Sequence, residues 1–455
     1  MSVEWKAAVL LFCGAPVAMA QETTETPSLQ RRDLDNGLEV LVVENHAAPL
    51  ATILVAVRSG AAVQRTTERG LAHLYEHVLF RSYGNGPSAF GSDAGRLNAS
   101  YNGTTSHEVV TYYVLLPSEN AEAGIRLLGR LATDPRFRVS DLAEERAVVL
   151  DELERGQADP EQALVREVSR QLWGAAWHRR DVGGDSLSLM GITAVRLTEE
   201  YQRYYVPNNA ALIVTGDVIA ADVFAAAAEH FAEWQARDDP FAGQQFVPYA
   251  PLAGSRAVIV ARDLTDVTIH LKMSGPGLRT DPEATYAADA LFDILNDPSS
   301  HFQEELVRGG LFQSVGASYL TLSEQGPITI SGKTTVARAH DALEALLAQI
   351  DSLALLVGVD EEDLLIAARR REVDASIARE AAATLAPTLA FWWATGGTDY
   401  YRTYPDHMNA LTLDDLRRFA EQYLVGKPKV MGLLGPDEAM ARIAQWLGTG
   451  VRSVP

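Results

Sequence analysis

Two histidines and a glutamate stand close together in the run His73-Leu74-Tyr75-Glu76-His77. On a helix, His73 and His77 are one turn apart and face the same side, so both imidazoles can bind one metal ion. Glu76 lies on that face too, which places a carboxylate beside the metal without making it a ligand. The order H-x-x-E-H is the inverzincin arrangement, the reverse of the commoner H-E-x-x-H. The alternative, two surface histidines, fits the apolar residues around them poorly.

A hydrolytic zinc site takes three protein ligands and keeps one position open for water. The only cysteine, Cys13, lies in the N-terminal segment, so the third ligand should be another histidine or a carboxylate. Glu145 and Glu152 stand two turns apart and share a face of a predicted helix over 139–155. A charge-rich helix is usually only a solvated face, so these residues alone leave the third ligand open. The acidic residues on this helix are Glu144, Glu145, Asp151, Glu152 and Glu154.

The elements that must position these residues follow from the hydrophobic pattern. Strand-like runs cover 38–43, 51–57, 109–116 and 210–214. Helical spacing covers 68–80, 121–132, 139–155 and 162–172. Asp35-Asn36-Gly37 ahead of the first run is a hairpin-type signal.

The same order of elements recurs in the second half of the chain. Tyr205-Val206-Pro207-Asn208 leads through a strand to Gly216-Asp217 and a helix, and 423–425 leads through a strand to Gly435-Pro436-Asp437 and another helix. An offset of about 218 residues, close to half the chain, indicates a duplicated α/β unit. The alternative is coincidence, because strand-glycine-helix units are common. The proline-rich stretch 238–254 is the predicted linker between domains at 30–237 and 255–455.

Composition limits the partners and the compartment. With 39 Lys and Arg against 60 Asp and Glu, the formal charge of -21 argues against nucleic acid as a partner. Residues 1–20 run from Lys6 through an apolar stretch to Ala18-Met19-Ala20, which is typical of a signal peptide and predicts a periplasmic or secreted protein. Gly14 and Pro16 interrupt a run already too short to span a bilayer, so we expect no stable membrane span.

Several motifs together resemble those of the insulinase or pitrilysin family of zinc metallopeptidases, in particular two-domain members such as the mitochondrial processing peptidases and bacterial heterodimeric relatives. The resemblance implies an α+β fold (an α/β sandwich) of two homologous domains, each a largely antiparallel sheet packed with helices. It covers nearly the whole first half. The matching stretches are 35–38, 70–80, 102–108, 112–113, 145–152, 205–208 and 216–217.

The resemblance also implies a role for each site residue. Glu152 is then the third zinc ligand, with Glu154 as the competitor on the adjoining turn, and one Zn²⁺ is bound per chain. Glu145 is a supporting carboxylate, and Glu76 is the general base that activates water. Peptide substrate is expected to pair as a strand along the edge that contains Asn102 and Gly103.

The second half lacks a site of its own, since no H-x-x-E-H occurs after residue 250. Ala367 and Asp374 stand where Glu145 and Glu152 stand in the first half. The family often supplies an arginine and a tyrosine, seven residues apart, from this region or from a partner chain. Here those positions hold Leu306 and Gln313.

Arg308 and Tyr319 lack the matching spacing and are poor substitutes for this pair. The resemblance therefore implies a homologous partner subunit that carries the arginine and tyrosine, with this chain as the zinc-bearing member. The expected activity is hydrolysis of unfolded peptides or oligopeptides. The alternative is a non-catalytic assembly or peptide-binding subunit of the same fold.

Overall fold

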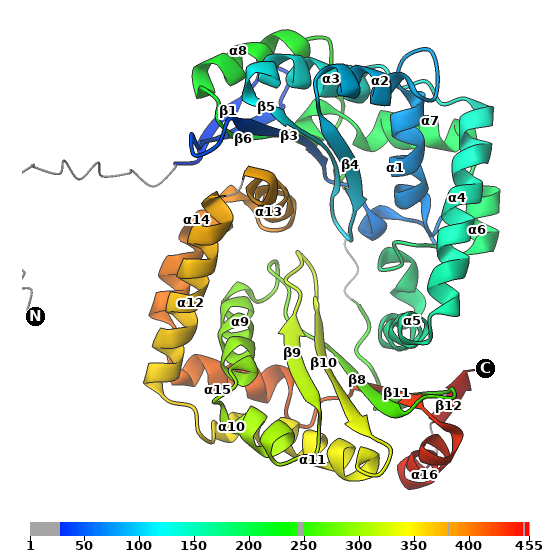
Figure 1. The fold of residues 1–455 in the computed structure, drawn as a ribbon, viewed down its shortest axis with the longest axis vertical. Coiled ribbons are helices and arrows are strands. Elements are labelled where there is room, and N and C mark those ends of the chain that lie inside the picture. Colours follow the sequence, from blue (N-terminus) through cyan, green and yellow to red (C-terminus); the bar gives the residue numbers. More distant parts are fainter. Residues whose placement is uncertain (1–27, 244–248, 381, 449–450, 455) are drawn as a thin grey trace, which may run out of the picture.

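The computed structural model describes residues 28–243, 249–380, 382–448 and 451–454. The predicted signal peptide at 1–20 and residues 244–248 of the predicted linker lie outside the described residues. Within those ranges, no helix has both the length and the apolar character needed to cross a membrane. The chain forms two six-stranded sheets with helices packed around them (Figure 1), so the α+β prediction is confirmed.

The first sheet has the order β1-β2-β6-β3-β5-β4, and all its neighbouring strands are antiparallel except β2 and β6. Apolar and β-branched runs form the central strands, because such side chains pack well on a pleated surface. The strands are β1 Gln30–Asp33, β2 Glu39–Glu44, β3 Leu50–Val57, β4 Ser100–Thr105, β5 Val110–Pro117 and β6 Ala210–Gly216. The helices of this half are α1 Leu71–Ser82, α2 Ala89–Arg96, α3 Ala121–Thr133, α4 Val139–Ala158, α5 Pro160–Trp173, α6 Ser186–Gly191, α7 Ala194–Tyr204 and α8 Ala220–His230.

The second sheet has the order β12-β7-β11-β8-β10-β9. Its strands are β7 Arg256–Ala261, β8 Asp266–Ser274, β9 Ser314–Tyr319, β10 Pro327–Thr335, β11 Val430–Gly435 and β12 Val451–Val454. Its helices are α9 Pro282–Asn296, α10 His301–Gln303, α11 Ala339–Ser352, α12 Glu361–Glu380, α13 Ala382–Thr395, α14 Gly397–Ala410, α15 Leu413–Tyr423 and α16 Asp437–Leu447.

The two sheets share one topology. Without the outermost strands β1 and β12, the orders are 2-6-3-5-4 and 7-11-8-10-9, and the first two strands of each set are parallel. The two homologous domains expected from the sequence have this arrangement. We propose 30–237 and 255–455 as their limits, joined by 238–254.

Each half also covers the sheet of the other half with one helix (Figure 1). Helix α5 follows α4 but packs on the second sheet, where Leu164 and Val168 lie against Val258, Val430 and Leu434. Helix α13 follows α12 but packs on the first sheet. There its apolar residues, which are Leu385, Ala386, Leu389, Ala390 and Trp393, contact β2, β3 and β6. The exchange is reciprocal, so each sheet has one face covered from across the domain boundary.

Candidate metal centre

Helix α1 carries the two histidines, and its packing decides which way they point. Leu74, Tyr75 and Val78 are fully buried in the first core, so the opposite side of α1 faces α4. The helix begins after Gly70, whose φ of 83° is in the left-handed region. A Cβ on Gly70 would lie 2.9 Å from the carbonyl oxygen of Gly183. Glycine is therefore required at the turn that starts the helix.

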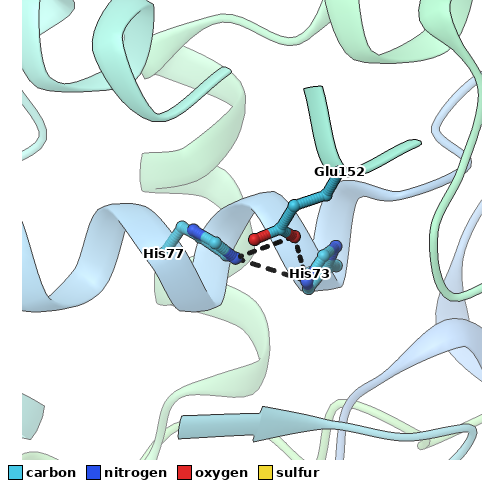
Figure 2. Close-up of side chains that lie close together, drawn as sticks. All are labelled: His73, His77 and Glu152. Carbon is cyan, nitrogen blue, oxygen red and sulfur yellow. Dashed lines mark hydrogen bonds and ion pairs between the residues drawn. The ribbon is translucent and has the colours of Figure 1, made fainter. Parts of the chain in front are cut away.

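His73, His77 and Glu152 converge on one point (Figure 2). The two histidine Nε2 atoms are 3.3 Å apart, and Glu152 Oε2 lies 3.7 Å from His73 Nε2 and 3.8 Å from His77 Nε2. Two atoms bound tetrahedrally at zinc's usual 2.0–2.1 Å are separated by about 3.3 Å. The donor set and its spacing therefore fit a zinc ion, and it is the only such group among the described residues. Glu154 is exposed and is not part of it.

Glu145 supports the site from behind His77. Its Oε2 lies 3.1 Å from His77 Nδ1, and its other oxygen pairs with Arg81. Although burial acts in the opposite direction, the contacts with His77 and Arg81 lower the pKa of Glu145, so it stays ionised. A carboxylate on the second ring nitrogen fixes the orientation of an imidazole ligand.

The imidazole of His73 has no such support. Its Nδ1 is buried and has no hydrogen-bond partner among the described residues. Burial lowers the pKa of His73, which favours the neutral, ligating form. The two histidines are thus held by different means, one by a carboxylate and one by burial.

Glu76 is held between α1 and β4. Its side chain is 9% exposed, and Thr105 on β4 donates a hydrogen bond to Oε2 over 2.8 Å. Burial raises the pKa of Glu76, which favours proton uptake. Its Oε1 faces Gly103, where an added Cβ would lie only 2.6 Å away. One oxygen is therefore anchored, and the other lies beside the strand edge.

Asn102 and Gly103 lie next to each other on β4, the outermost strand of the first sheet. The backbone N–H of Ser106 donates to Val109, and inter-strand bonds alternate along an antiparallel pair. The main-chain groups of Gly103 therefore point away from β5 and toward the open edge. The Gly103 N–H is bonded by the side-chain oxygen of Asn102 at 3.0 Å. The structure thus brings both residues to the edge beside Glu76.

Sequence reasoning missed a cavity that adjoins the ligands. It has a volume of about 550 Å³ and lies between α4 and α5, with His73 and Glu152 in its wall. Its other lining residues include the apolar Val149, Leu153, Val165 and Trp177 and the polar Glu161 and Arg166. The helix expected over 162–172 did not reveal this cavity, because the cavity forms only where α5 packs against α4.

Leu306 and Gln313, at the positions where the resemblance led us to look for an arginine and a tyrosine, have other roles in the structure. Leu306 is fully buried in the second core, and Gln313 bonds Asp266 over 3.0 Å. Arg308 donates to the carbonyl of Pro298, and the hydroxyl of Tyr319 donates to the carbonyl of Pro276. Gln313, Arg308 and Tyr319 are thus each bonded to a residue of the second half.

The second half holds an ion pair where the first half holds its ligands. Asp289 and Asp293 stand one turn apart on α9 and face α12, much as the histidines of α1 face α4. Arg371 of α12 binds Asp293 over 2.8 Å and lies 3.7 Å from Asp289. Ala367 is buried and Asp374 is exposed, so neither joins this group. A guanidinium occupies this face of α9, which leaves no place for a metal cation.

Comparison with known proteins identifies the lineage of this fold. Residues 39–184 match the family model described as insulinase, peptidase family M16. Residues 191–370 match the model described as the peptidase M16 inactive domain. The chain belongs to the insulinase family of peptidases, family M16. The resemblance seen in the sequence is thereby confirmed. The inactive-domain match begins within the first half and covers the second half as far as residue 370.

Individual relatives agree with this assignment. A Rickettsia felis protein, named as an uncharacterized zinc protease, is 23% identical over 76% of this chain and 83% of the relative. The crystal structure of a protease from Helicobacter pylori superimposes with a TM-score of 0.80 at 20% identity, covering 90% of this chain and all of that one. The periplasmic protease PqqL from Escherichia coli gives a TM-score of 0.74 at 18% identity, covering 91% of this chain but 48% of PqqL.

Proposed function

We propose that this chain is a zinc-dependent peptidase that hydrolyses unfolded peptides or oligopeptides. The observation that carries the proposal is the convergence of His73, His77 and Glu152 beside a buried Glu76 whose Oε1 lies against Gly103 on the edge strand β4. The names of the relatives as zinc proteases favour zinc over other divalent ions. We propose one ion per chain.

The protein groups divide the work of peptide hydrolysis. A bound zinc ion would lower the pKa of a coordinated water and polarise the scissile carbonyl. Glu76 Oε1 accepts a proton from the attacking water and returns it to the leaving amine, while Thr105 holds Oε2 in place. The edge of β4 at Gly103 pairs with the peptide main chain, which gives affinity with little sequence preference. The cavity beside Glu152 accepts a substrate side chain, and its apolar wall favours apolar residues.

A partner subunit completes the proposal. Leu306 is apolar and buried, and the side-chain amide of Gln313 is bonded to Asp266, so we propose that a homologous chain supplies an arginine and a tyrosine. PqqL, which is about twice as long as the stretch it shares with this chain, is an example of a longer protein built on this fold. Because a signal peptide is predicted at 1–20, we propose that the assembly lies in the periplasm or outside the cell.

A second candidate is a non-catalytic, peptide-binding subunit. The match of 191–370 to an inactive domain favours it. The complete ligand set in the first half favours the peptidase, since a binding subunit has no need of a base held beside metal ligands.

The decisive experiment measures metal content and cleavage of an unfolded peptide for the chain alone and mixed with a candidate partner. Glu76→Gln is compared with the unchanged chain, and zinc is removed with a chelator and restored. We expect stoichiometric zinc in both chains, with cleavage abolished in the variant and by chelation. Equal cleavage by Glu76→Gln would rule out the assigned base, and full activity of the isolated chain would rule out the partner.

A further inference from the structure

The two sheets end in equivalent edge strands, β4 in the first and β9 in the second. Each pairs with one neighbour, β5 or β10, and lies at the end of its sheet. An edge strand presents unpaired N–H and C=O groups that can bind an extended peptide as an added strand. The topology by itself therefore offers two docking edges per chain.

The main-chain groups of Ala317 point outward from β9. Leu320 N–H donates to the carbonyl of Pro327, so the alternation of an antiparallel pair directs Ser318 and Gly316 toward β10 and Ala317 away from it. The outward groups are already bonded. Asn296 Nδ2 donates to the carbonyl of Ala317 over 2.7 Å, and the Ala317 N–H donates to Asn296 Oδ1 over 2.9 Å.

Asn296 therefore takes the place of a residue in an added strand. A side-chain amide offers one acceptor and a donor, as a peptide group does, and here it satisfies both main-chain groups of Ala317. The next outward carbonyl along the edge, that of Val315, accepts from Gln303 Nε2 over 3.0 Å. Gln303 is itself fixed by a second bond, to the carbonyl of Leu295.

Among the described residues, no side chain from another element covers the edge of β4 in a comparable way. The Gly103 N–H is bonded only by the exposed side chain of its own neighbour, Asn102, which can rotate away when a peptide arrives. Asn102 lies on β4 itself, whereas Asn296 and Gln303 reach β9 from helices that are fixed in the second core. The two equivalent edges therefore differ in what a peptide must displace.

We propose that Asn296 and Gln303 are specificity-determining residues that close the edge of β9, so that an extended peptide docks only at β4. This inference rests on the proposed function, in which β4 is the docking edge. It adds that the second half is kept from binding peptide by two side chains.

The test counts bound peptides by calorimetric titration. The background is Glu76→Gln, which prevents cleavage, and the probe is an extended peptide of about ten residues, the length of a long strand. We expect one peptide per chain, rising to two when Asn296→Ala and Gln303→Ala are added. Gln313→Ala is the matched control, because Gln313 lies just before β9 but bonds Asp266. The Asn296 side chain is exposed, so its loss should leave the melting temperature close to that of the background.

Gly103→Pro separates the inference from the function on which it rests. Proline removes the N–H that the β4 edge offers. When Gly103→Pro is added to the background, we expect no bound peptide. When it is added to the opened variant, which also carries Asn296→Ala and Gln303→Ala, we expect one bound peptide, at β9. If the background chain binds two peptides, the edge of β9 is not closed and the inference is overturned. It is also overturned if the variant with Asn296→Ala and Gln303→Ala binds only one peptide and Gly103→Pro abolishes that binding. With Gly103 unchanged, no bound peptide in the background and one in the opened variant would support the closed edge of β9 and refute docking at β4. No binding in either would refute both.

Discussion

Gly103 and Glu76 are packed so closely that only a glycine fits the present position of the carboxylate. A Cβ on Gly103 would lie 2.6 Å from Glu76 Oε1 and 2.8 Å from its Cγ. The proposed docking edge and the proposed general base are therefore in direct contact. The structure thus gives a steric reason for a glycine at this position.

Gly103→Ala should displace Glu76 and lower kcat more than it changes KM. The added methyl group leaves the main-chain N–H and C=O available for the peptide but pushes Oε1 from its place. A misplaced general base costs roughly 10²–10⁴-fold in rate. Steady-state kinetics on one peptide tests this, with Gly95→Ala as control because no atom lies within 4 Å of a Cβ there. A rise in KM at constant kcat would contradict the steric account.

Glu145→Gln should weaken zinc binding while leaving the three ligands in place. An amide still reaches His77 Nδ1 but cannot hold it by charge, and loss of such a support costs about 10–100-fold in metal affinity. Competition with a chelating dye measures the change. Glu144→Gln is the control, since Glu144 also pairs with Arg81 but does not contact His77. Equal affinity in the two variants would assign Glu145 no role at the metal.

Filling the cavity should change which peptides are cleaved. Val165→Trp narrows the space between α4 and α5, so kcat/KM should fall for peptides with a large apolar side chain next to the scissile bond and change little for those with alanine there. Val148→Trp, on the exposed side of α4, serves as control. A uniform loss across the peptide series would show that the cavity does not select side chains.

Gly432→Val should loosen the packing of α5 on the second sheet. A Cβ at Gly432 would lie 2.5 Å from Val168 and 3.2 Å from Leu164. Overpacking of this kind costs about 1–3 kcal/mol. Urea unfolding measures the loss, and Gly254→Val, where no atom lies within 4 Å of a Cβ, should be nearly neutral.

His270 should make stability fall as the solution becomes acidic. Burial, together with the charge of Lys272, lowers the pKa of His270 from 6.5 to about 4. The unfolded chain therefore binds a proton between these values while the folded chain does not, so stability present above pH 6.5 is lost as pH falls toward 4. The shift in the pKa of His270 corresponds to a loss on the order of 3 kcal/mol in the free energy of unfolding.

His270→Gln should remove that part of the acid sensitivity. Urea unfolding at pH 7 and pH 4.5, with chelator present so that metal release does not contribute, gives the difference directly. His340→Gln, at an exposed histidine, should leave the pH dependence of the unfolding free energy unchanged. If the pH dependence of the unfolding free energy is unaltered in His270→Gln, this histidine is not the source of the acid sensitivity.

The convergence of His73 and His77 was predictable because helical spacing is a local property. His73 and His77 had to share a face, and the periodicity of α1 fixed which one. Choosing Glu152 over Glu154 required the family resemblance, since both lie on the same helix and only the packing of α4 against α1 separates them. The helices α2, α6 and α7 were missed. Helices α2 and α6 have only eight and six residues, too few to show a helical repeat. Helix α7 does carry Leu197, Tyr201 and Tyr204 at helical spacing, a signal that the sequence reading overlooked.

Contacts between distant elements were beyond the reach of the sequence. Asn296 looks like an ordinary residue at the end of a helix, and its two bonds to Ala317 depend on where α9 meets β9. The cavity beside Glu152 depends in the same way on the position of α5. The charge pattern on α9 and α12 gave no hint that Arg371 would lie between Asp289 and Asp293.

The exchange of α5 and α13 bears on how the chain is made. As synthesis proceeds, the first sheet is complete once β6 has emerged, yet its apolar outer face stays bare until Trp393 has been added. The portion that carries the candidate metal ligands therefore cannot reach its final form as an early, independent unit. Folding of the whole molecule can be completed only after the last quarter of the chain has been synthesised. A chain released before α13 is made would therefore have an exposed, aggregation-prone sheet.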